Sequence, residues 1–115
     1  MAADQRTADA FGVHLCPVVV GITAQDAHTA THAEPLRVER LDAQFDALAA
    51  DKPPCVVKTG RLGDAAQVRC VARWIDRLRE RAPVSLVVDP VLDAGCGGAP
   101  FADDATVNAY RDELL

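Results

Sequence analysis

Short apolar runs alternate with amphipathic stretches along this chain, and that alternation constrains its fold more than any other feature. The runs at 14–23, 55–59 and 84–88 are rich in valine, which is typical of strands that are covered on both faces. Between them, residues 36–50 and 64–80 carry apolar side chains at helical spacing. Strands that alternate with helices form parallel sheets through right-handed crossovers. The sequence therefore predicts an α/β layered fold with a mainly parallel sheet flanked by helices.

Residues with known preferences for helix ends mark the boundaries of the predicted helices. Residues 2–11 form a short predicted helix that ends at Gly12, because glycine adopts the left-handed conformation at little cost. Pro35 is well placed to start the helix over 36–50. Asp64 is a natural N-cap for the helix that follows it, since its carboxylate can accept hydrogen bonds from unpaired backbone N–H groups.

The predicted elements fill one domain that spans residues 1–115, a length sufficient for a single hydrophobic core. A short strand is predicted at 30–33, and a last helix runs from Asp104 to the C-terminus. Because the chain stops inside that helix and begins as abruptly, we expect an incomplete domain, with a natural terminal helix as the alternative. An incomplete sheet leaves an open edge, which predicts pairing with another chain in a homo-oligomer or an aggregate.

Charge, apolar runs and cysteine spacing exclude several classes of protein. The formal net charge is −5 and the arginines are interleaved with acidic residues, which argues against nucleic acid as a partner. The longest apolar run, residues 15–22, is far shorter than the roughly 20 residues that span a bilayer. With no signal-peptide pattern at the N-terminus, we predict no membrane partner and a cytoplasmic location. The four cysteines form no Cys-x-x-Cys pair, so free thiols are expected instead of a zinc site.

Polar residues follow three of the predicted strands, at the edge where parallel α/β sheets bind their ligands. These segments are 23–26, 58–64 and 89–91. Gln25 can both donate and accept hydrogen bonds, which suits the edge of an aminopyrimidine, although closing a turn explains it equally well. Lys58 and Gly60 can serve a polar or anionic ligand, with a solvated lysine and a turn glycine as the simpler alternative.

Two aspartates are further candidates for a functional site. Asp89 ends an apolar strand, where a carboxylate is costly to bury unless it is paired or near a metal. In a phosphoryl-transfer enzyme such a carboxylate can help to hold Mg²⁺ and the phosphates, whereas a turn before Pro90 explains it without function. Asp4 lies in the first turn of the first helix, where the helix dipole favours a carboxylate whatever the function.

Five short segments, taken in order, resemble the hydroxymethylpyrimidine/phosphomethylpyrimidine kinases, which are ribokinase-like enzymes of thiamine biosynthesis. The segments are Ala3-Asp4, Phe11-Gly12-Val13-His14, Ile22-Thr23-Ala24-Gln25, Val57-Lys58-Thr59-Gly60 with Leu62-Gly63, and Val87-Val88-Asp89-Pro90-Val91. Each segment is weak alone, whereas the ordered set with strands and helices between its members is fairly specific. The resemblance implies a partial ribokinase-like (Rossmann-like) α/β fold.

The resemblance also implies an activity with its cofactors. The γ-phosphate of Mg·ATP would be transferred to 4-amino-5-hydroxymethyl-2-methylpyrimidine and then to the monophosphate of that pyrimidine. Lys58 and Asp89 would lie on the phosphate side of the site, and Asp89 would also contact the metal.

On the pyrimidine side, the resemblance implies that Gln25 recognises the ring and that Asp4 lines the same pocket. Gly60, Arg61 and Val91 would pack near the ring. Arg61 departs from the family, which usually carries a methionine at this position. A guanidinium there would change either the polarity of the pocket or its ligand.

Other departures concern phosphate transfer. Where the family usually has a lysine before a Ser-Gly pair, this chain has Gly95-Cys96-Gly97, and no glycine-rich segment precedes Asp4. The later Asn-and-Glu segment and the Gly-Thr-Gly anion hole are also missing from the sequence. Because phosphoryl transfer depends on positioning and charge stabilisation, we expect the isolated chain to be an inactive fragment of such a kinase. The alternatives are a non-catalytic pyrimidine-binding or protein-interaction module derived from the family, and an unrelated flavodoxin-like or Rossmann-like domain.

Overall fold

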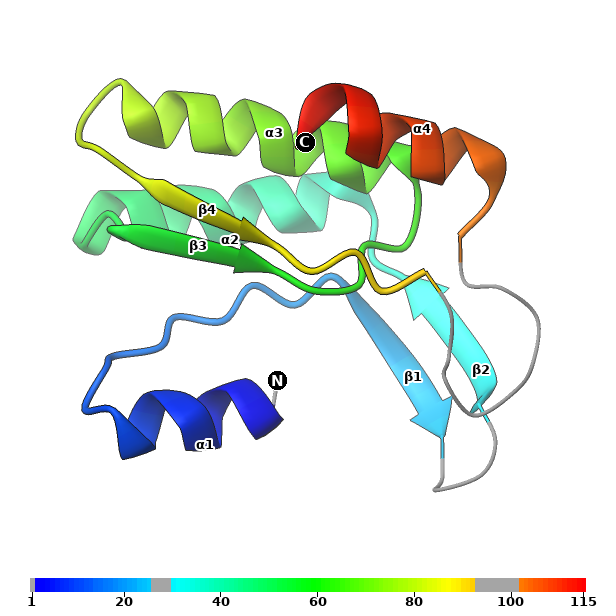
Figure 1. Ribbon diagram of the computed structural model, residues 1–115, viewed down its shortest axis with the longest axis horizontal. Coiled ribbons are helices and arrows are strands. Elements are labelled where there is room, and N and C mark those ends of the chain that lie inside the picture. Colours follow the sequence, from blue (N-terminus) through cyan, green and yellow to red (C-terminus); the bar gives the residue numbers. More distant parts are fainter. Residues whose placement is uncertain (1, 26–29, 93–101) are drawn as a thin grey trace.

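Four helices and four strands make up the part of the chain that the computed structural model describes, which is residues 2–25, 30–92 and 102–115 (Figure 1). In chain order they are α1 (Ala2–Ala10), β1 (Gly21–Gln25), β2 (Ala30–Pro35), α2 (Val38–Asp51), β3 (Val56–Thr59), α3 (Ala65–Arg79), β4 (Ser85–Val88) and α4 (Asp104–Glu113). As predicted, Gly12 follows α1 with a positive φ of 65°. Within the described ranges, no helix is long and apolar enough to cross a membrane.

The strands pair in two different ways. β3 and β4 run parallel and are joined through α3, as the sequence predicts, with Val56 opposite Ser85 and Thr59 opposite Val88. β1 and β2 instead pair antiparallel, which departs from the expected mainly parallel sheet. Only residues 26–29 separate these two strands, and a parallel pair needs a much longer crossover. The described residues therefore form one parallel and one antiparallel two-stranded sheet.

The buried strand predicted over 14–23 is wrong for most of its length, because β1 begins only at Gly21. Before that point, the backbone of Val19 is held by the side-chain amide of Gln44 in α2. The Val19 N–H donates to Gln44 Oε1 at 2.8 Å, and Gln44 Nε2 donates to the Val19 carbonyl at 2.9 Å. A side chain thus takes the place of a neighbouring strand, and Pro17 has no N–H to offer a ladder.

The predicted role of Pro35 as the start of the following helix is also corrected. Pro35 is the last residue of β2, and α2 begins at Val38 with Arg37 as its extended N-cap. The backbone N–H of Leu36 donates to the carbonyl of Val20 at 2.9 Å. The pairing of the hairpin therefore continues past the proline, which keeps this stretch extended.

α3 has both the N-cap and the apolar stripe that the sequence predicts. An oxygen of the Asp64 carboxylate accepts a hydrogen bond from the backbone N–H of Gln67 at 2.8 Å. Four apolar residues at helical spacing in this stretch are buried: Val68, Val71, Ile75 and Leu78. α3 is therefore the central helix of the core.

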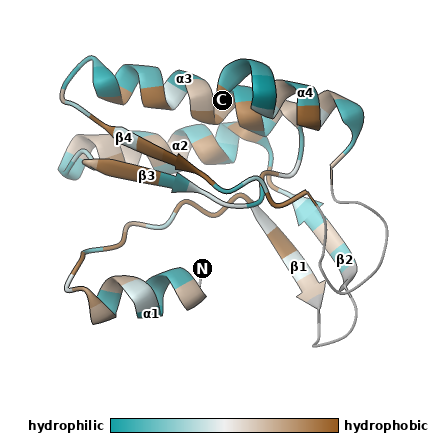
Figure 2. Ribbon diagram, viewed as in Figure 1, coloured by the Kyte–Doolittle hydropathy of each residue, from teal (hydrophilic) through white to brown (hydrophobic). Residues whose placement is uncertain are grey.

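α2 and α4 complete the core by packing against α3, and β3 and β4 bring mostly hydrophobic residues to it (Figure 2). Phe45 of α2 stacks on Trp74 of α3 with ring centroids 5.3 Å apart, an arrangement worth about 1 kcal/mol beyond burial alone. The indole N–H of Trp74 donates to the carboxylate of Asp42 at 2.7 Å, which lowers the pKa of Asp42. The core thus contains a buried indole whose polar atom is satisfied.

Gln67 joins three separate segments through one buried amide. Its Nε2 donates to the carbonyls of Val20 at 2.8 Å and Leu36 at 2.6 Å, and its Oε1 accepts from the N–H of Gly63 at 2.8 Å. The side chain is 1% exposed, so water has little access to replace these bonds. The amide therefore ties the β1–β2 hairpin to the unit formed by β3 and α3.

The described cysteines are free thiols, as expected from their spacing. Cys16 and Cys55 are exposed and Cys70 is buried in α3, whereas Cys96 lies outside the described residues. Burial, followed by the hydrogen bond to Asp42, raises the pKa of Cys70 to about 11. A protonated thiol in this setting is a poor nucleophile.

Replacing Gln67 with methionine tests the dependence of the fold on the buried amide. Gln67→Met keeps the length of the side chain but leaves the Gly63 N–H and the Leu36 carbonyl without this partner, while the Val20 carbonyl keeps its bond from the Leu36 N–H. We therefore expect the free energy of unfolding to fall by roughly 3 kcal/mol in urea titrations. The matched control is Gln5→Met, which removes an exposed bond to Asp9 and should change stability by less than about 0.5 kcal/mol. Equal effects of the two substitutions would contradict the role of Gln67.

Alkylation tests the placement of the thiols. With iodoacetamide at about pH 8, we expect Cys16 and Cys55 to be modified while Cys70 stays protected until the protein is unfolded, because burial shields the Cys70 thiol and raises its pKa to about 11. Peptide mass spectrometry with and without urea distinguishes the sites. If Cys70 in the folded protein were modified as fast as Cys55, its burial in α3 would be contradicted.

Candidate functional site

The carboxyl ends of β3 and β4 lie side by side. The backbone N–H of Asp89 donates to the carbonyl of Thr59 at 3.0 Å, which continues the parallel pairing beyond the last residue of β4. Lys58 and Gly60 flank Thr59, so two of the three predicted ligand segments converge on one edge, as the sequence predicts. The third segment contains Gln25, which ends β1 in the other sheet, and its next residue lies outside the described part of the chain.

An ion-pair cluster joins this edge to α1. Lys58 Nζ lies 3.1 Å from Asp4 Oδ1 and 3.4 Å from Asp89 Oδ2. α1 lies on the side of β3 and β4 opposite α3, so Lys58 bridges the sheet edge and a separate helix (Figure 1). The structure therefore brings together three of the predicted site residues, which come from three distant parts of the sequence.

The charge of Lys58 is stabilised by its surroundings. Its pKa is raised, chiefly by the hydrogen bond to Asp4 and also by Asp89, against the opposing effect of partial burial. All three side chains remain partly exposed, so solvent screens these ion pairs and limits their contribution to stability. Lys58 was predicted on the phosphate side of the site, and its contacts place it between Asp89 and the residue predicted for the pyrimidine side, Asp4.

The loop after β3 is held by a residue that sequence reasoning missed. The hydroxyl of Tyr110, in α4, accepts a hydrogen bond from the N–H of Leu62 at 2.9 Å and donates one to the carbonyl of Gly60 at 3.1 Å. Tyr110 is 2% exposed. The sequence shows only a tyrosine in a helix, with no signal that its hydroxyl would reach a loop about 50 residues earlier.

Two further residues predicted for the pyrimidine side, Arg61 and Val91, follow β3 and β4 at this edge. Arg61 is half-buried between Gly60 and Leu62, and its charge acts on Tyr110 by lowering the pKa of the hydroxyl. Burial of Tyr110 has the larger effect, so the pKa of Tyr110 is raised overall. Val91 is half-buried two residues beyond Asp89, at the same edge.

The predicted metal contact at Asp89 stays a prediction. Within the described ranges, no group of three or more His, Cys, Asp or Glu side chains is placed to hold a metal ion. Mg²⁺ commonly binds proteins through one or two carboxylates together with substrate phosphates and water. Asp89 fits that pattern as a single carboxylate contact, and it would share its charge with Lys58. The loop Gly95-Cys96-Gly97 lies outside the described residues.

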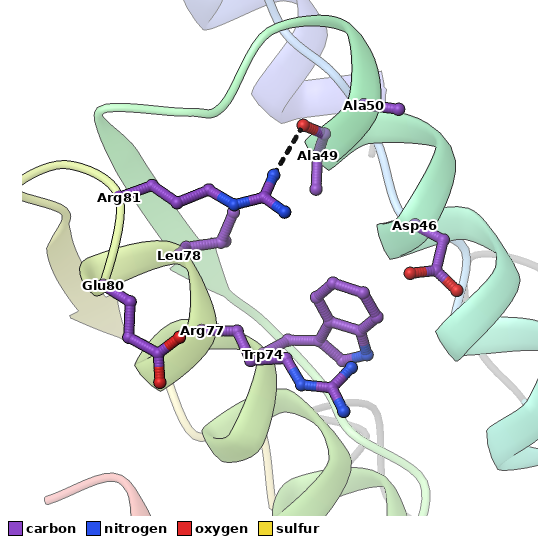
Figure 3. Close-up of a pocket in the computed structure, with 8 residues that line it drawn as sticks. All are labelled: Asp46, Ala49, Ala50, Trp74, Arg77, Leu78, Glu80 and Arg81. Atoms are coloured by element: carbon purple, nitrogen blue, oxygen red, sulfur yellow. Dashed lines mark hydrogen bonds between the residues drawn. The ribbon is translucent and has the colours of Figure 1, made fainter.

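A separate pocket of about 430 Å³ lies between the C-terminal halves of α2 and α3 (Figure 3). The guanidinium of Arg77 lies 5.0 Å from the ring centroid of Trp74, and Arg81 donates to the carbonyl of Ala49 at 3.2 Å. α3 ends near the start of β4, so this pocket is at the opposite end of the strands from the ion-pair cluster. It contains none of the residues predicted for the functional site.

Comparisons with known proteins agree with the sequence segments. The family model for phosphomethylpyrimidine kinase matches residues 1–115. The chain is 36% identical over 113 residues to the hydroxymethylpyrimidine/phosphomethylpyrimidine kinase of Rhizobium meliloti, covering 98% of this chain and 41% of that protein. The corresponding kinase of Bacillus subtilis is also 36% identical, with 98% of this chain and 40% of that protein covered. The chain thus spans about 40% of the length of these curated relatives.

Solved structures show the same fold. A crystal structure of phosphomethylpyrimidine kinase from Clostridium difficile matches with a TM-score of 0.84 and 26% identity, over 97% of this chain and 47% of that chain. A structure described as the last common ancestor of two groups of vitamin kinases matches with a TM-score of 0.77 and 28% identity. The predicted resemblance and the partial ribokinase-like α/β fold are therefore confirmed.

Removing the Lys58 ammonium tests the cluster. No residue of α1 is buried, so its attachment depends on surface contacts such as the ion pair with Asp4. In Lys58→Met we expect the amides of α1 to exchange hydrogen about two- to fivefold faster, measured by mass spectrometry. Because the pKa of Lys58 is raised and that of Asp4 is lowered to about 2, the contribution of their ion pair should be complete between about pH 4 and pH 10.5. It should be lost as the pH rises through the raised pKa of Lys58 or falls towards the lowered pKa of Asp4.

The matched control for this prediction is Lys52→Met, at the exposed end of α2. It changes the net charge equally without touching the cluster, so exchange in α1 should not change. Equal exchange in the two variants would show that the cluster does not hold α1.

Proposed function

Because this chain belongs to the phosphomethylpyrimidine kinase family, we propose that it forms the pyrimidine-binding half of an ATP-dependent kinase of thiamine biosynthesis. The substrates would be 4-amino-5-hydroxymethyl-2-methylpyrimidine and its monophosphate. The nucleotide follows from the reaction class, since a kinase needs a phosphoryl donor. ATP and Mg²⁺ are the donor and metal that we propose.

The observation that carries this proposal is the cluster of Asp4, Lys58 and Asp89. Phosphoryl transfer needs an acceptor hydroxyl close to the γ-phosphate, with positive charge placed to stabilise the developing negative charge. Lys58 supplies such a charge between the carboxylate proposed for the pyrimidine side and the one proposed for the phosphate side. Its position at the carboxyl ends of two parallel strands is where α/β folds bind ligands.

The other proposed roles are those that the family resemblance implies. The amide of Gln25 would pair with the edge of the pyrimidine ring, and Gly60, Arg61 and Val91 would pack near the ring. Asp89 would contact Mg²⁺ together with the phosphates of the nucleotide. Binding of Mg²⁺ by Asp89 would weaken the ion pair between Asp89 and Lys58. The ammonium of Lys58 would then be able to pair with a phosphate.

We also propose that the 115-residue chain binds the pyrimidine without transferring phosphate. The segments that the family resemblance assigns to the anion hole are not in this sequence, and the anion hole stabilises charge in the transition state. A non-catalytic pyrimidine-binding or protein-interaction module is the second candidate. The half-buried Arg61 favours it, because a cation at this position alters the pyrimidine pocket.

Calorimetry with 4-amino-5-hydroxymethyl-2-methylpyrimidine tests the pyrimidine site. We expect the wild-type chain to bind this compound and Gln25→Ala to bind it about tenfold more weakly, as the loss of ring hydrogen bonds would cause. Asn108→Ala is the control, because it removes an exposed amide on α4 and should leave the affinity unchanged. No binding by the wild-type chain would refute the pyrimidine site.

Incubation of the chain with the same pyrimidine, ATP and Mg²⁺ tests the second part of the proposal. We expect no phosphorylated pyrimidine by mass spectrometry, because binding alone does not stabilise the transition state. A full-length kinase of the family is the positive control. Turnover by the 115-residue chain would show that its own residues suffice for phosphoryl transfer.

A further inference from the structure

We infer that Tyr110 is a positioning residue for the pyrimidine side of the site, acting through the loop that carries Gly60 and Arg61. This inference rests on the proposed function for its ligand, whereas the contacts of Tyr110 with the loop are independent of that function. Tyr110 lies in α4, outside every segment of the family resemblance, and would not touch the substrate. Its role would be to hold residues that do.

One oxygen atom holds the loop on both sides of Arg61. The N–H of Leu62 donates to the Tyr110 hydroxyl at 2.9 Å, and this hydroxyl donates to the carbonyl of Gly60 at 3.1 Å. Both bonds use backbone groups of the loop, so they fix the path of the chain and not merely a side chain. Movement of the Arg61 backbone would break at least one of them.

Packing confines this loop unevenly, because Thr59 and Leu62 are buried whereas Gly60 between them is half-buried. A Cβ atom built on Gly60 would meet nothing within 4 Å, so no neighbour confines Gly60 on the side where a side chain would lie, and glycine has wide conformational freedom. At the other end of the loop, a Cβ on Gly63 would lie 2.5 Å from the Pro35 Cβ, so that end is sterically confined. The hydrogen bond from the Tyr110 hydroxyl therefore restrains Gly60, which steric contact does not confine in the way it confines Gly63.

Tyr110 is itself well fixed. Asp103 caps α4 by accepting hydrogen bonds from the N–H of Thr106 at 2.8 Å and from its hydroxyl at 2.6 Å. Thr106 and Ala109 are buried in the packing of α4 on α3. The tyrosine ring projects from a rigid element, which suits a group that must hold other residues in place.

The protonation of Tyr110 also suits this role. Burial raises the pKa of Tyr110, with smaller opposing effects from the hydrogen bond of Leu62 and the charge of Arg61. The hydroxyl therefore keeps its proton beyond the ordinary tyrosine range, and the proton is what the Gly60 carbonyl accepts. Ionisation of the hydroxyl would break its hydrogen bond to the Gly60 carbonyl but keep the one from the Leu62 N–H. The two hydrogen bonds of Tyr110 therefore respond differently to pH.

The first experiment compares Tyr110→Phe with a matched control. Tyr110→Phe keeps the ring but removes the hydroxyl, so we expect the Leu62 amide to exchange hydrogen at least about tenfold faster by NMR. Affinity for 4-amino-5-hydroxymethyl-2-methylpyrimidine should fall about fivefold, as the loss of a net hydrogen bond predicts. Trp74→Phe also removes one buried polar bond from an aromatic ring, that to Asp42, and should leave both quantities unchanged.

The two readouts separate the inference from the proposed function. If the wild-type chain does not bind the pyrimidine, the proposed function fails, and exchange at Leu62 still decides whether Tyr110 holds the loop. Unchanged Leu62 exchange in Tyr110→Phe overturns the inference. Unchanged pyrimidine affinity in Tyr110→Phe, with binding intact in the wild-type chain, overturns it as well.

A second experiment does not require the substitution to fold. Tyr110 is the single tyrosine of the chain, so growth with 3,5-difluorotyrosine labels this position alone and makes its hydroxyl more acidic. We expect pyrimidine affinity to fall about fivefold as the fluorinated hydroxyl ionises, over a pH range in which the unlabelled protein shows no change. Ultraviolet absorbance of the phenolate gives the pKa of the label. Identical pH profiles of the two proteins would overturn the inference.

Discussion

The buried amide of Gln67 is the interaction on which the arrangement of the described elements depends. It binds backbone groups of Val20, Leu36 and Gly63, which belong to the segment before β1, the segment after β2 and the loop before α3. The β1–β2 hairpin has no strand pairing with β3 or β4, so hydrogen bonds of this kind take the place of a continuous sheet. Because the Gln67 side chain is buried, water has little access to replace these hydrogen bonds, and they hold the three segments in their relative positions.

The loop from Lys58 to Gly63 is restrained at successive points by different kinds of force. Lys58 is held by partly exposed ion pairs, Gly60 by the hydroxyl of a buried tyrosine, and Gly63 by the hydrogen bond from its N–H to Gln67. The ion pairs are the weakest of these because solvent screens them. α1 contributes Asp4 and buries no residue, so it is the element most easily released from the site. The site thus combines a firmly held loop with a loosely held helix.

Membership of the phosphomethylpyrimidine kinase family gives the ion-pair cluster a chemical context. The fold agrees with that of a solved kinase over 97% of this chain, although the match covers only 47% of the kinase chain. Fold alone does not assign a reaction, so the proposed roles depend on the side chains at the strand ends. The half-buried Arg61 is the main departure from the family pattern, and it lies between the two backbone groups that Tyr110 holds. Any effect of this guanidinium on ligand choice would therefore be exerted from a fixed position.

The sequence by itself determined the elements whose signals are local. The valine-rich runs predicted β3 and β4, and the apolar stripe together with Asp64 predicted α3, because periodicity and helix caps act over a few residues. The ordered segments indicated the family. Tertiary structure decided the rest. Of the strand predicted over 14–23, the part before Gly21 is not a strand, and there Gln44 binds the backbone of Val19 from 25 residues away. The bonds of Gln67 and Tyr110 likewise span 47 and 50 residues, and no local pattern distinguishes a solvated amide or hydroxyl from one that is buried against a distant backbone group. The sequence named Asp4, Lys58 and Asp89 as separate candidates, and only folding brought their charges within contact distance.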